Sequence, residues 1–358
     1  MAATRSYRLG VLKGDGIGPE VVAAAEAVAR AATTLEDLAV EWIPLPMGWD
    51  AIRTFGHPMP ASTKDALAEC DGWIMGPHDS VSYPPDQQVH RNPSGELRHH
   101  FDLYANIRPA ATFPGVPAHV AQADLVVVRE NTEEFYPDRN MFEGRGEWMP
   151  TPDIALSVGV FTRRAAERIA HVAFRLAQER RRHVSIVHKV NAIRLGTGLF
   201  LRVCREVAAA YPDVRVDDYL VDAMTAHLVR RPHDFDVIVT TNMFGDILSD
   251  LAAELTGSLG LAASINAGDA HAMAQATHGA APDIAGRNIA NPTAEILSTA
   301  LLMDWLARRH DDARWSRAAE RIRRATLGAI AGGARTPDLG GSLTTTAFTD
   351  AVLERLDG

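Results

Sequence analysis

The stretch Asn242-Met-Phe-Gly-Asp-Ile-Leu-Ser-Asp250 places two aspartates four residues apart in a run whose apolar residues have helical spacing. Side chains at positions i and i+4 lie on one helix face, so the carboxylates of Asp246 and Asp250 point the same way. A hard divalent cation such as Mg²⁺ or Mn²⁺ takes oxygen ligands and would stabilise such a pair. Two plainer interpretations stay open from spacing alone: a solvated acidic face, or Asp246 as a first-turn partner of the helix dipole.

This stretch follows a short β-branched strand at residues 235–240, and the same strand-to-helix order recurs along the chain. Further strands are predicted at residues 7–12, 40–45, 72–75, 125–129 and 184–188, and helices at residues 21–32, 163–181, 197–210, 246–256, 294–309, 314–331 and 346–356. Alternating strands and helices predict an α/β protein with a largely parallel sheet. In open sheets of this kind, ligands bind beyond the carboxyl ends of the strands.

Composition limits the function classes. The chain has 358 residues, 46% of them apolar, and a net charge of −9. Its length suggests about two domains, and its acidity argues against nucleic acid as a partner. Cys70 and Cys204 are far apart and are expected to be buried small side chains. No signal-peptide core or membrane-spanning apolar run is present, so we expect a cytoplasmic protein without membrane contact.

Three arginines, Arg98, Arg108 and Arg129, are candidates for binding an acidic substrate. Guanidinium groups bind carboxylates through paired hydrogen bonds, which a lysine cannot reproduce. A surface position is the plainer interpretation, and for Arg98 alone it would be preferred. Arg129 is harder to explain in this way, because it closes an apolar strand and opens a polar loop.

Tyr136 and Lys189 are candidates for proton transfer. Tyr136 lies seven residues after Arg129, and Lys189 follows the predicted strand at residues 184–188. A lysine partly buried beside a cation gives up its proton more readily and can act as a general base, while a tyrosine can return a proton. Each residue alone is more often structural, but together with metal-binding carboxylates they form a plausible proton-transfer site.

The loop His278-Gly-Ala-Ala-Pro-Asp-Ile-Ala-Gly286 contains small residues that let a backbone approach a ligand closely. Asp283 could accept hydrogen bonds from a ribose diol, although composition alone favours an ordinary turn. The other glycine-rich segment, Gly14-Asp-Gly-Ile-Gly18, is not G-x-G-x-x-G, because its last glycine comes one residue early. This second segment therefore predicts a tight strand-to-helix turn and no Rossmann fold.

Taken together, these segments resemble the β-decarboxylating dehydrogenases, the family of isocitrate, isopropylmalate, homoisocitrate and tartrate/malate dehydrogenases. The resemblance covers nearly the whole chain, and so many matches in order and approximate spacing are highly specific. The matching segments are Leu12-Lys-Gly-Asp-Gly-Ile-Gly-Pro-Glu20, Tyr104-Ala-Asn-Ile-Arg-Pro109, Arg129-Glu-Asn-Thr-Glu133, His188-Lys-Val-Asn191, Val221-Asp222, the stretch 242–250, the loop 278–286 and Pro337-Asp-Leu-Gly-Gly341.

The resemblance implies oxidative decarboxylation of a malate-type 2-hydroxy-3-carboxy acid with a divalent metal, Mg²⁺ or Mn²⁺. Arg98, Arg108 and Arg129 would hold the substrate carboxylates, and Asp246 and Asp250 would bind the metal. Asp222 would complete the metal site from the partner subunit of a homodimer, and Lys189 and Asn191 would also cross the dimer. Lys189 would remove the hydroxyl proton and Tyr136 would protonate the enol, while the metal acts as a Lewis acid.

The same resemblance assigns the cofactor. His278, Gly279, Asp283, Ile284 and Asn291 would contact it, and Asp283 with Ile284 is similar to the NAD type. Relatives that prefer NADP place a lysine and a tyrosine at these two positions. A 2′-phosphate next to Asp283 would suffer charge repulsion, so NAD is the expected cofactor.

Two departures from the family pattern concern substrate and cofactor. Gln275 stands where the family usually has a glutamate, three residues before His278. Ser94, with Asn92 nearby, occupies a segment in which isopropylmalate enzymes present leucines. An apolar substituent would leave such a hydrogen-bonding lining unpaired, at about 1–3 kcal/mol per buried group. We therefore favour a polar γ-group, as in isocitrate, homoisocitrate or tartrate, over isopropylmalate.

The expected architecture is the isopropylmalate dehydrogenase-like α/β fold, with two α/β domains around a central cleft. Residues 1–104 plus 257–358 would form a discontinuous NAD-binding domain. Residues 105–256 would form the dimerisation and metal/substrate domain, with a possible arm at residues 138–152. The alternatives are a 3-isopropylmalate dehydrogenase, a non-catalytic regulatory subunit, which typically loses one of the catalytic or metal-binding residues, and a dehydrogenase of phosphorylated hydroxy-amino acids. The last chemistry favours histidine-rich zinc ligation over carboxylates.

Overall fold

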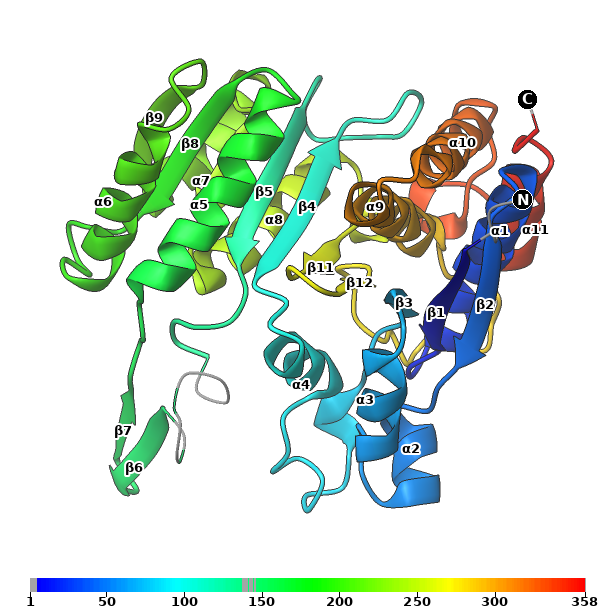
Figure 1. The fold of residues 1–358 in the computed structure, drawn as a ribbon, viewed down its shortest axis with the longest axis horizontal. Helices are drawn as coiled ribbons and strands as arrows, with labels where there is room; N and C mark the ends of the chain where they lie inside the picture. Colours follow the sequence, from blue (N-terminus) through cyan, green and yellow to red (C-terminus); the bar gives the residue numbers. More distant parts are fainter. Residues whose placement is uncertain (1–4, 137–140, 142–143, 145, 358) are drawn as a thin grey trace.

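A sheet of ten strands runs through the computed structural model, which describes residues 5–136, 141, 144 and 146–357 (Figure 1). The strands of this sheet are β1 (Ser6–Leu12), β2 (Ala39–Pro44), β3 (Gly72–Met75), β4 (Ala105–Ala111), β5 (Asp124–Glu130), β8 (His183–His188), β9 (Arg215–Leu220), β10 (Val237–Thr240), β11 (Ile265–Ala267) and β12 (Ala272–Ala274). Their spatial order is β2-β1-β3-β12-β11-β4-β5-β10-β8-β9. Pairing is parallel at both ends of the sheet and antiparallel between β12 and β11, β11 and β4, and β4 and β5.

Helices cover both faces of the sheet. They are α1 (Gly18–Leu35), α2 (Gly48–Phe55), α3 (Ala61–Ala68), α4 (Pro93–His100), α5 (Arg163–Gln178), α6 (Gly196–Ala208), α7 (Val221–Arg230), α8 (Asn242–Thr256), α9 (Thr293–His310), α10 (Ala313–Ala331) and α11 (Thr345–Leu353). Short 3₁₀ turns lie at Ser80–Ser82, Pro232–Asp234, Leu259–Leu261 and Pro337–Leu339. The predicted α/β class is therefore confirmed.

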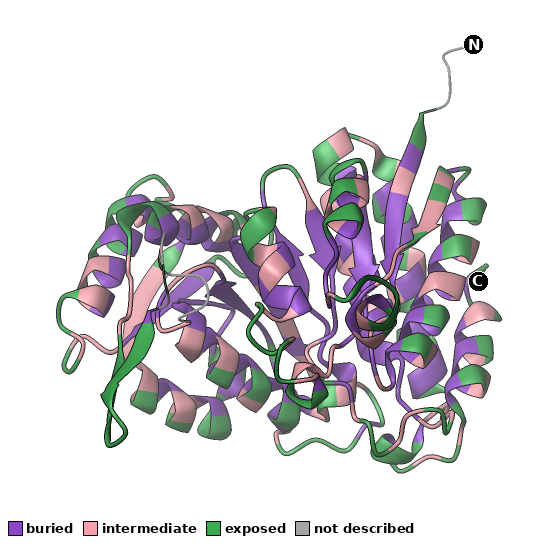
Figure 2. Cartoon of the chain, turned by 90° about the horizontal axis from the view of Figure 1, so that it is seen from below, coloured by how far each residue is buried: buried purple, intermediate pink, exposed green. Residues whose placement is uncertain are grey.

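Buried residues lie along the sheet and on the helix faces that cover it (Figure 2), and the apolar ones form four clusters in the described residues. One joins α1, α9, α10 and α11 to the β1 side of the sheet, and a smaller one lies around Trp73 and Met75. In the middle of the chain, α5 and α6 bury one face of β5, β8 and β10, while α7 and α8 bury the other. N- and C-terminal residues thus share a core largely separate from that of the middle residues, which supports the proposed domain division.

A two-stranded ribbon, β6 (Glu147–Thr151) with β7 (Ile154–Ser157), projects away from the sheet (Figure 1). All of its residues are exposed, including Trp148, Met149, Ile154 and Leu156. Much of the predicted arm at residues 138–152 lies outside the described residues. Apolar side chains exposed together on a projecting ribbon favour a contact with another protein surface.

Several elements were not expected from the sequence. These elements carry few apolar residues in clear periodicity or are very short. They are the strands β4, β9, β11 and β12 and the helices α2, α3, α4 and α7. Within the described ranges, none of the helices combines the length and apolar composition that crossing a bilayer requires.

Candidate functional site

Arg129 lies at the centre of the candidate site. It stands near the carboxyl end of β5, opposite Thr240 of the parallel neighbour β10. Helix α8 begins two residues after Thr240, so its first turns lie beside Arg129. The guanidinium, only 1% exposed, donates to Asn242 Oδ1 through Nε (3.0 Å) and Nη2 (2.7 Å) and forms a short contact with Asp246.

Gly245 provides the space for this arrangement. A Cβ atom at this position would lie 2.5 Å from Arg129 Cγ and 2.6 Å from its Cβ. Glycine costs about 1 kcal/mol in a helix relative to alanine, so its presence in the middle of α8 has a packing reason. The Arg129 side chain can pass over α8 only at a residue that has no side chain of its own.

The aspartate pair lies on α8 as predicted, and the helix begins at Asn242. Asp246 is therefore in the second turn, and the alternative interpretation of a first-turn dipole partner is wrong. Burial raises the pKa of Asp246, but Arg129, Arg108, Tyr136 and the more distant Arg98 outweigh it and leave the pKa below its usual value. Burial raises the pKa of Asp250, and repulsion from Asp246 adds to the rise.

Arg108 joins both aspartates from β4. Its Nη1 lies 3.2 Å from Asp246 Oδ1 and 3.2 Å from Asp250 Oδ1, and also donates to Ser249 Oγ (2.7 Å). Its Nε donates to Asn106 Oδ1 at 2.6 Å. Burial lowers the pKa of Arg108 to about 10, so the side chain stays charged at neutral pH. Two arginines and two carboxylates therefore converge at one edge of the sheet.

Tyr136 is held inside this group. Its hydroxyl accepts from Arg129 Nη2 (2.8 Å) and donates to Asp246 Oδ2 (2.9 Å). A tyrosine hydroxyl between a guanidinium and a carboxylate is oriented on both sides, which suits a group that transfers a proton.

Lys189 and Asp222 form a separate pair. Lys189 Nζ donates to Asp222 Oδ1 at 2.5 Å, and this hydrogen bond lowers the pKa of Asp222. Lys189 follows β8, which lies one strand beyond β10 from β5, so the strands that lead to Lys189 and Arg129 are about 10 Å apart. Within the described parts of this single chain, no three His, Cys, Asp or Glu side chains come close enough to hold a metal ion. In the described residues, Asp246 and Asp250 therefore have no third side chain of these types close enough to complete a metal site. Asn191 lies exposed two residues after Lys189.

Ser94 and Arg98 lie one turn apart on α4 and both reach Gln275. Ser94 Oγ donates to Gln275 Oε1 at 2.9 Å, and Arg98 Nη2 lies 3.5 Å from the same oxygen. Ser94 is 4% exposed and Gln275 is 7% exposed. Asn92, the other polar residue of this segment, accepts from Gly95 N at 2.7 Å and caps α4.

The loop at residues 278–286 packs against the turn at residues 14–18. Ile17 N donates to Ala280 O at 2.9 Å, and a Cβ on Gly16 would lie 1.9 Å from that oxygen. Gly16 has φ of 58°, and Glu20 Oε1 accepts from Gly286 N at 2.5 Å. The glycine-rich turn therefore supports the candidate cofactor loop.

The loop side chains fit a cofactor. His278 Nδ1 contacts Gly279 O at 3.1 Å, whereas its Nε2 is buried without a hydrogen-bond partner in the described part of the structure. Gly279 has open space where a Cβ would project, and Asp283 is exposed. Ile284 packs against the apolar cluster beneath the loop. Asn291 instead binds Asp338 (3.0 Å) and Thr293 N (3.0 Å), which indicates a structural role for its side chain.

Sequence reasoning missed several supporting residues. Glu134 accepts from Met243 N at 2.6 Å and so caps α8 from the loop after β5. Asn106 and Asn131, which lie two residues from Arg108 and Arg129 respectively, both donate to Asn266 Oδ1, at 3.1 and 3.0 Å. Asn242 and Ser249 stood in the quoted stretch, but only the fold reveals that they bind Arg129 and Arg108. The other supporting residues are polar and lie at or near strand ends, and this is the one sequence signal that could have identified them.

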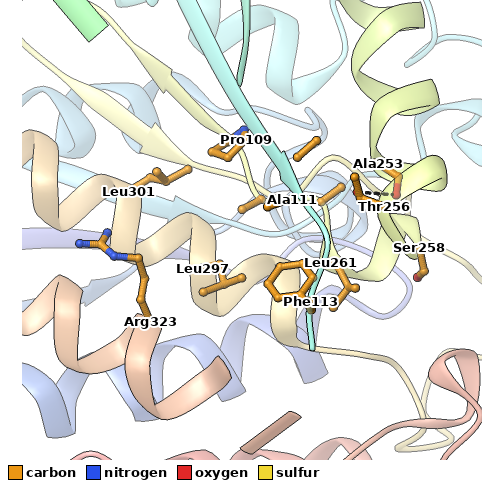
Figure 3. Close-up of a pocket in the computed structure, with 13 residues that line it drawn as sticks. Pro109, Ala111, Phe113, Ala253, Thr256, Ser258, Leu261, Leu297, Leu301 and Arg323 are labelled. Atoms are coloured by element: carbon orange, nitrogen blue, oxygen red, sulfur yellow. Dashed lines mark hydrogen bonds between the residues drawn. The ribbon is translucent and has the colours of Figure 1, made fainter. Parts of the chain in front are cut away.

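A cavity of about 110 Å³ lies elsewhere, between β4, α8 and α9 (Figure 3). Its walls are apolar, with Phe113, Leu261, Leu297 and Leu301 among them. Arg323 at its edge is paired with Asp304 at 2.5 Å. The cavity therefore lacks groups that could carry out acid–base chemistry.

Comparison with known proteins places the chain in a family. The family model described as isocitrate/isopropylmalate dehydrogenase matches residues 8–352. The chain is 43% identical to an isocitrate/homoisocitrate dehydrogenase of Thermus thermophilus, covering 98% of this chain and 99% of that one. It is 38% identical to a 3-isopropylmalate/3-methylmalate dehydrogenase of Methanocaldococcus jannaschii, covering 98% and 99%. The crystal structure of an isocitrate dehydrogenase from Methylococcus capsulatus superimposes with a TM-score of 0.87 at 39% identity, covering 98% and 100%. The chain is thus an oxidoreductase with the expected fold, and it belongs to the isocitrate/isopropylmalate dehydrogenase family.

Proposed function

We propose that the protein catalyses the oxidative decarboxylation of a 2-hydroxy-3-carboxy acid with a polar γ-group, using NAD and Mg²⁺ or Mn²⁺. The observation that carries this proposal is the convergence of Arg108, Arg129, Tyr136, Asp246 and Asp250 at one sheet edge. The group combines cations for carboxylates, a proton donor and oxygen ligands. These are the components that this reaction requires.

Arg98, Arg108 and Arg129 would bind the two malate-type carboxylates. Arg108 and Arg129 are buried and therefore rigid, and Arg108 is held on Asn106 at 2.6 Å. Rigid guanidinium groups orient a substrate through paired hydrogen bonds at little entropic cost. In this structure Asp246 forms ion pairs with Arg108 and Arg129, and Asp250 forms one with Arg108. The substrate carboxylates would replace these ion pairs.

Lys189 would accept the hydroxyl proton, and Tyr136 would deliver a proton to the carbon that loses CO₂. The hydrogen bond from Lys189 to Asp222 fixes the position of Nζ, and the neutral amine of Lys189 would accept the proton. Tyr136 is aimed by Arg129 and Asp246 together.

The donor set fits a hard divalent cation, because Asp222, Asp246 and Asp250 offer only carboxylate oxygens. When bound, such a metal supplies Lewis-acid polarisation of the substrate oxygen, and NAD accepts the hydride. In the described part of the structure, His278 Nε2 is buried without a hydrogen-bond partner and the Asp283 carboxylate is exposed, and both features support a dinucleotide on the loop at residues 278–286. Asp283 would repel the 2′-phosphate of NADP.

A homodimer would bring Lys189, Asn191 and Asp222 of one subunit to Asp246 and Asp250 of the other. The separation of the two groups within one chain supports this. Ile247, between the two metal aspartates, is 53% exposed, and Val229 on α7 is 55% exposed. Exposed apolar residues on neighbouring helices favour a protein interface there.

The first experiment measures NAD⁺ and NADP⁺ reduction with Mn²⁺ and five acids: isocitrate, homoisocitrate, isopropylmalate, tartrate and malate. Turnover of at least one acid, with loss after metal chelation and a preference for NAD⁺, is expected. If no acid is turned over, the proposed reaction is wrong; if isopropylmalate is the best substrate, the assignment of a polar γ-group is wrong.

A second experiment tests the shared site with mixed subunits. Lys189→Met and Asp246→Asn chains should each be inactive alone, but their hybrid dimer would have one intact site and should regain about half of the wild-type activity per dimer. The matched control mixes Asp246→Asn with Asp250→Asn, whose mutations fall on the same half-site, so every site stays defective. Equal activity in both mixtures contradicts the shared site.

A further inference from the structure

A second cavity, the α5–α9 cavity, lies on the face of the sheet opposite to the candidate site. Its volume is about 360 Å³, and sites for small molecules range upward from about 300 Å³. Residues 104–107 and 267–269, at β4 and β11, form its floor. Its walls are residues 172–179 at the end of α5 and 305–309 at the end of α9, and Figure 1 shows these two helices on either side of β4.

The sheet separates this cavity from the candidate site. Ile107 of β4 lines the cavity and packs against the apolar clusters of α5 and α9. The next residue, Arg108, binds Ser249 of α8 at 2.7 Å, because successive side chains of a strand point to opposite faces. On β11, Ala267 lines the cavity, while Asn266 accepts from Asn106 at 3.1 Å on the other face. The cavity is therefore a place of its own.

One part of the lining is apolar. Ile107 belongs to the floor, Val172 and Leu176 come from α5, and Trp305 comes from α9. All four side chains are half-buried, so each still has apolar surface that a ligand could cover. Covering such surface is favourable in proportion to its area. This part of the cavity suits an apolar group.

The other part of the lining carries charges of both signs. Arg175 lies in the last turn of α5, and Arg308 and Arg309 lie in the last turn of α9. One basic residue at a helix C-terminus needs no ligand, because it complements the helix dipole. Here, however, three arginines from two helices line one cavity together with Glu179 and Asp269.

These charges do not neutralise one another. Among the described residues, no hydrogen bond or ion pair involves the side chains of the three arginines or of Glu179. Asp269 accepts only from the Tyr104 hydroxyl, at 2.9 Å. A purely anionic ligand would be repelled by the two carboxylates, and a purely cationic ligand by the arginines. A ligand with one charge of each sign avoids both penalties.

We propose that the α5–α9 cavity is a binding site for a free α-amino acid with a large apolar side chain. The carboxylate of the ligand pairs with the arginines, its ammonium group pairs with Glu179 or Asp269, and its side chain covers Trp305 and Leu176. This site is separate from the proposed reaction, so its occupancy is measured without substrate, metal or NAD.

Calorimetry of the wild type with L-leucine, L-phenylalanine and L-tryptophan is the first test. At least one of them should bind with a Kd of about 0.01–1 mM, and L-alanine, which lacks the apolar group, at least about tenfold more weakly. For the tightest ligand, the deaminated acid and the decarboxylated amine each lack one charge, and each should also bind at least about tenfold more weakly. Absence of binding by all three amino acids up to about 10 mM overturns the proposal, as does equal binding of the acid or the amine.

Variants of exposed residues assign the two charges. The double change Arg308→Gln/Arg309→Gln should weaken binding of the amino acid and of its deaminated acid, but not of the amine. Glu179→Gln should weaken binding of the amino acid and of the amine, but not of the acid. Arg164→Gln is the matched control, because Arg164 is exposed on the same helix α5 and lies outside the cavity. Unchanged affinity in both cavity variants overturns the proposal.

Hydrogen exchange locates the ligand in the wild type and so does not depend on how the variants fold. The tightest amino acid should slow amide exchange in residues 172–179 and 305–309. Slowing that is confined to residues 242–250 or to the loop at residues 278–286 would place the ligand in the candidate site and overturn the proposal.

Discussion

Replacement of Glu295 by glutamine should stabilise the protein, and more so as the pH rises. Glu295 lies in the first turn of α9 and is fully buried, with 0% exposure. Its Oε2 accepts from Ala276 N at 2.9 Å, while Oε1 has no hydrogen-bond partner in the described part of the structure. Burial raises the pKa of Glu295 to about 8, so the folded protein carries this side chain as a neutral acid at neutral pH.

The sign of the effect follows from the protons bound in each state. An unfolded chain releases the proton near the ordinary value of 4.5, whereas the folded chain keeps it until about 8. The unfolded state therefore binds fewer protons between these values, and stability falls as pH rises through this window. The full loss has an upper limit of about 5 kcal/mol, and structural relaxation with water entry is expected to reduce it to about 2–3 kcal/mol.

Glutamine keeps an oxygen for Ala276 N and does not ionise. We expect the unfolding midpoint of Glu295→Gln to match the wild type within a few degrees at pH 5 and to exceed it increasingly up to pH 8. Thermal or urea unfolding at each pH measures this. Glu254→Gln, on the exposed side of α8, is the control and should give a difference that does not depend on pH.

A third variant separates charge from hydrogen bonding. Glu295→Met removes the ionisable group and also the acceptor of Ala276 N, which leaves a buried amide unpaired at about 1–3 kcal/mol. It should be less stable than Glu295→Gln at every pH. If wild type and Glu295→Gln keep a constant difference from pH 5 to 8, the idea of a buried neutral acid is refuted.

The remaining predictions concern the site itself. Gly245→Ala should push Arg129 out of place, because the new Cβ would lie 2.5 Å from Arg129 Cγ. We expect kcat/KM to fall more than about 100-fold and the free energy of unfolding to fall by about 1–3 kcal/mol, and normal activity would contradict the packing argument. Tyr136→Phe should lower kcat about 10²- to 10⁴-fold with little change in KM, measured by steady-state kinetics; a change in KM alone would indicate a binding role. At a hundred times its Kd, Mn²⁺ should stabilise the wild type by about 2.7 kcal/mol, measured by thermal unfolding. Asp250→Asn should lose most of this stabilisation, and an equal stabilisation of the variant would mean that the metal binds elsewhere.

Local patterns predicted the longer helices, the strands with apolar runs and the shared helix face of the aspartate pair. The helical spacing of residues 242–250 placed Asp246 and Asp250 on one face of α8, and the structure has them there. Strands such as β3 and β8 were recognised from their β-branched or apolar runs. Elements such as β4 and α7 were missed, since polar residues interrupt the apolar pattern and their burial depends on distant partners.

What the sequence determined by itself is what depends on neighbours along the chain: helix faces, strand ends, the turn at residues 14–18 and the family to which the ordered motifs point. Only the tertiary structure decided that Arg129 binds Asn242 and Asp246, that Gln275 contacts Ser94 and Arg98, and that Lys189 pairs with Asp222 and not with Asp246 or Asp250. These contacts join residues from 33 to 181 positions apart. Their geometry depends on strand order and on the packing of α4 and α8 against the sheet, and no local period encodes it.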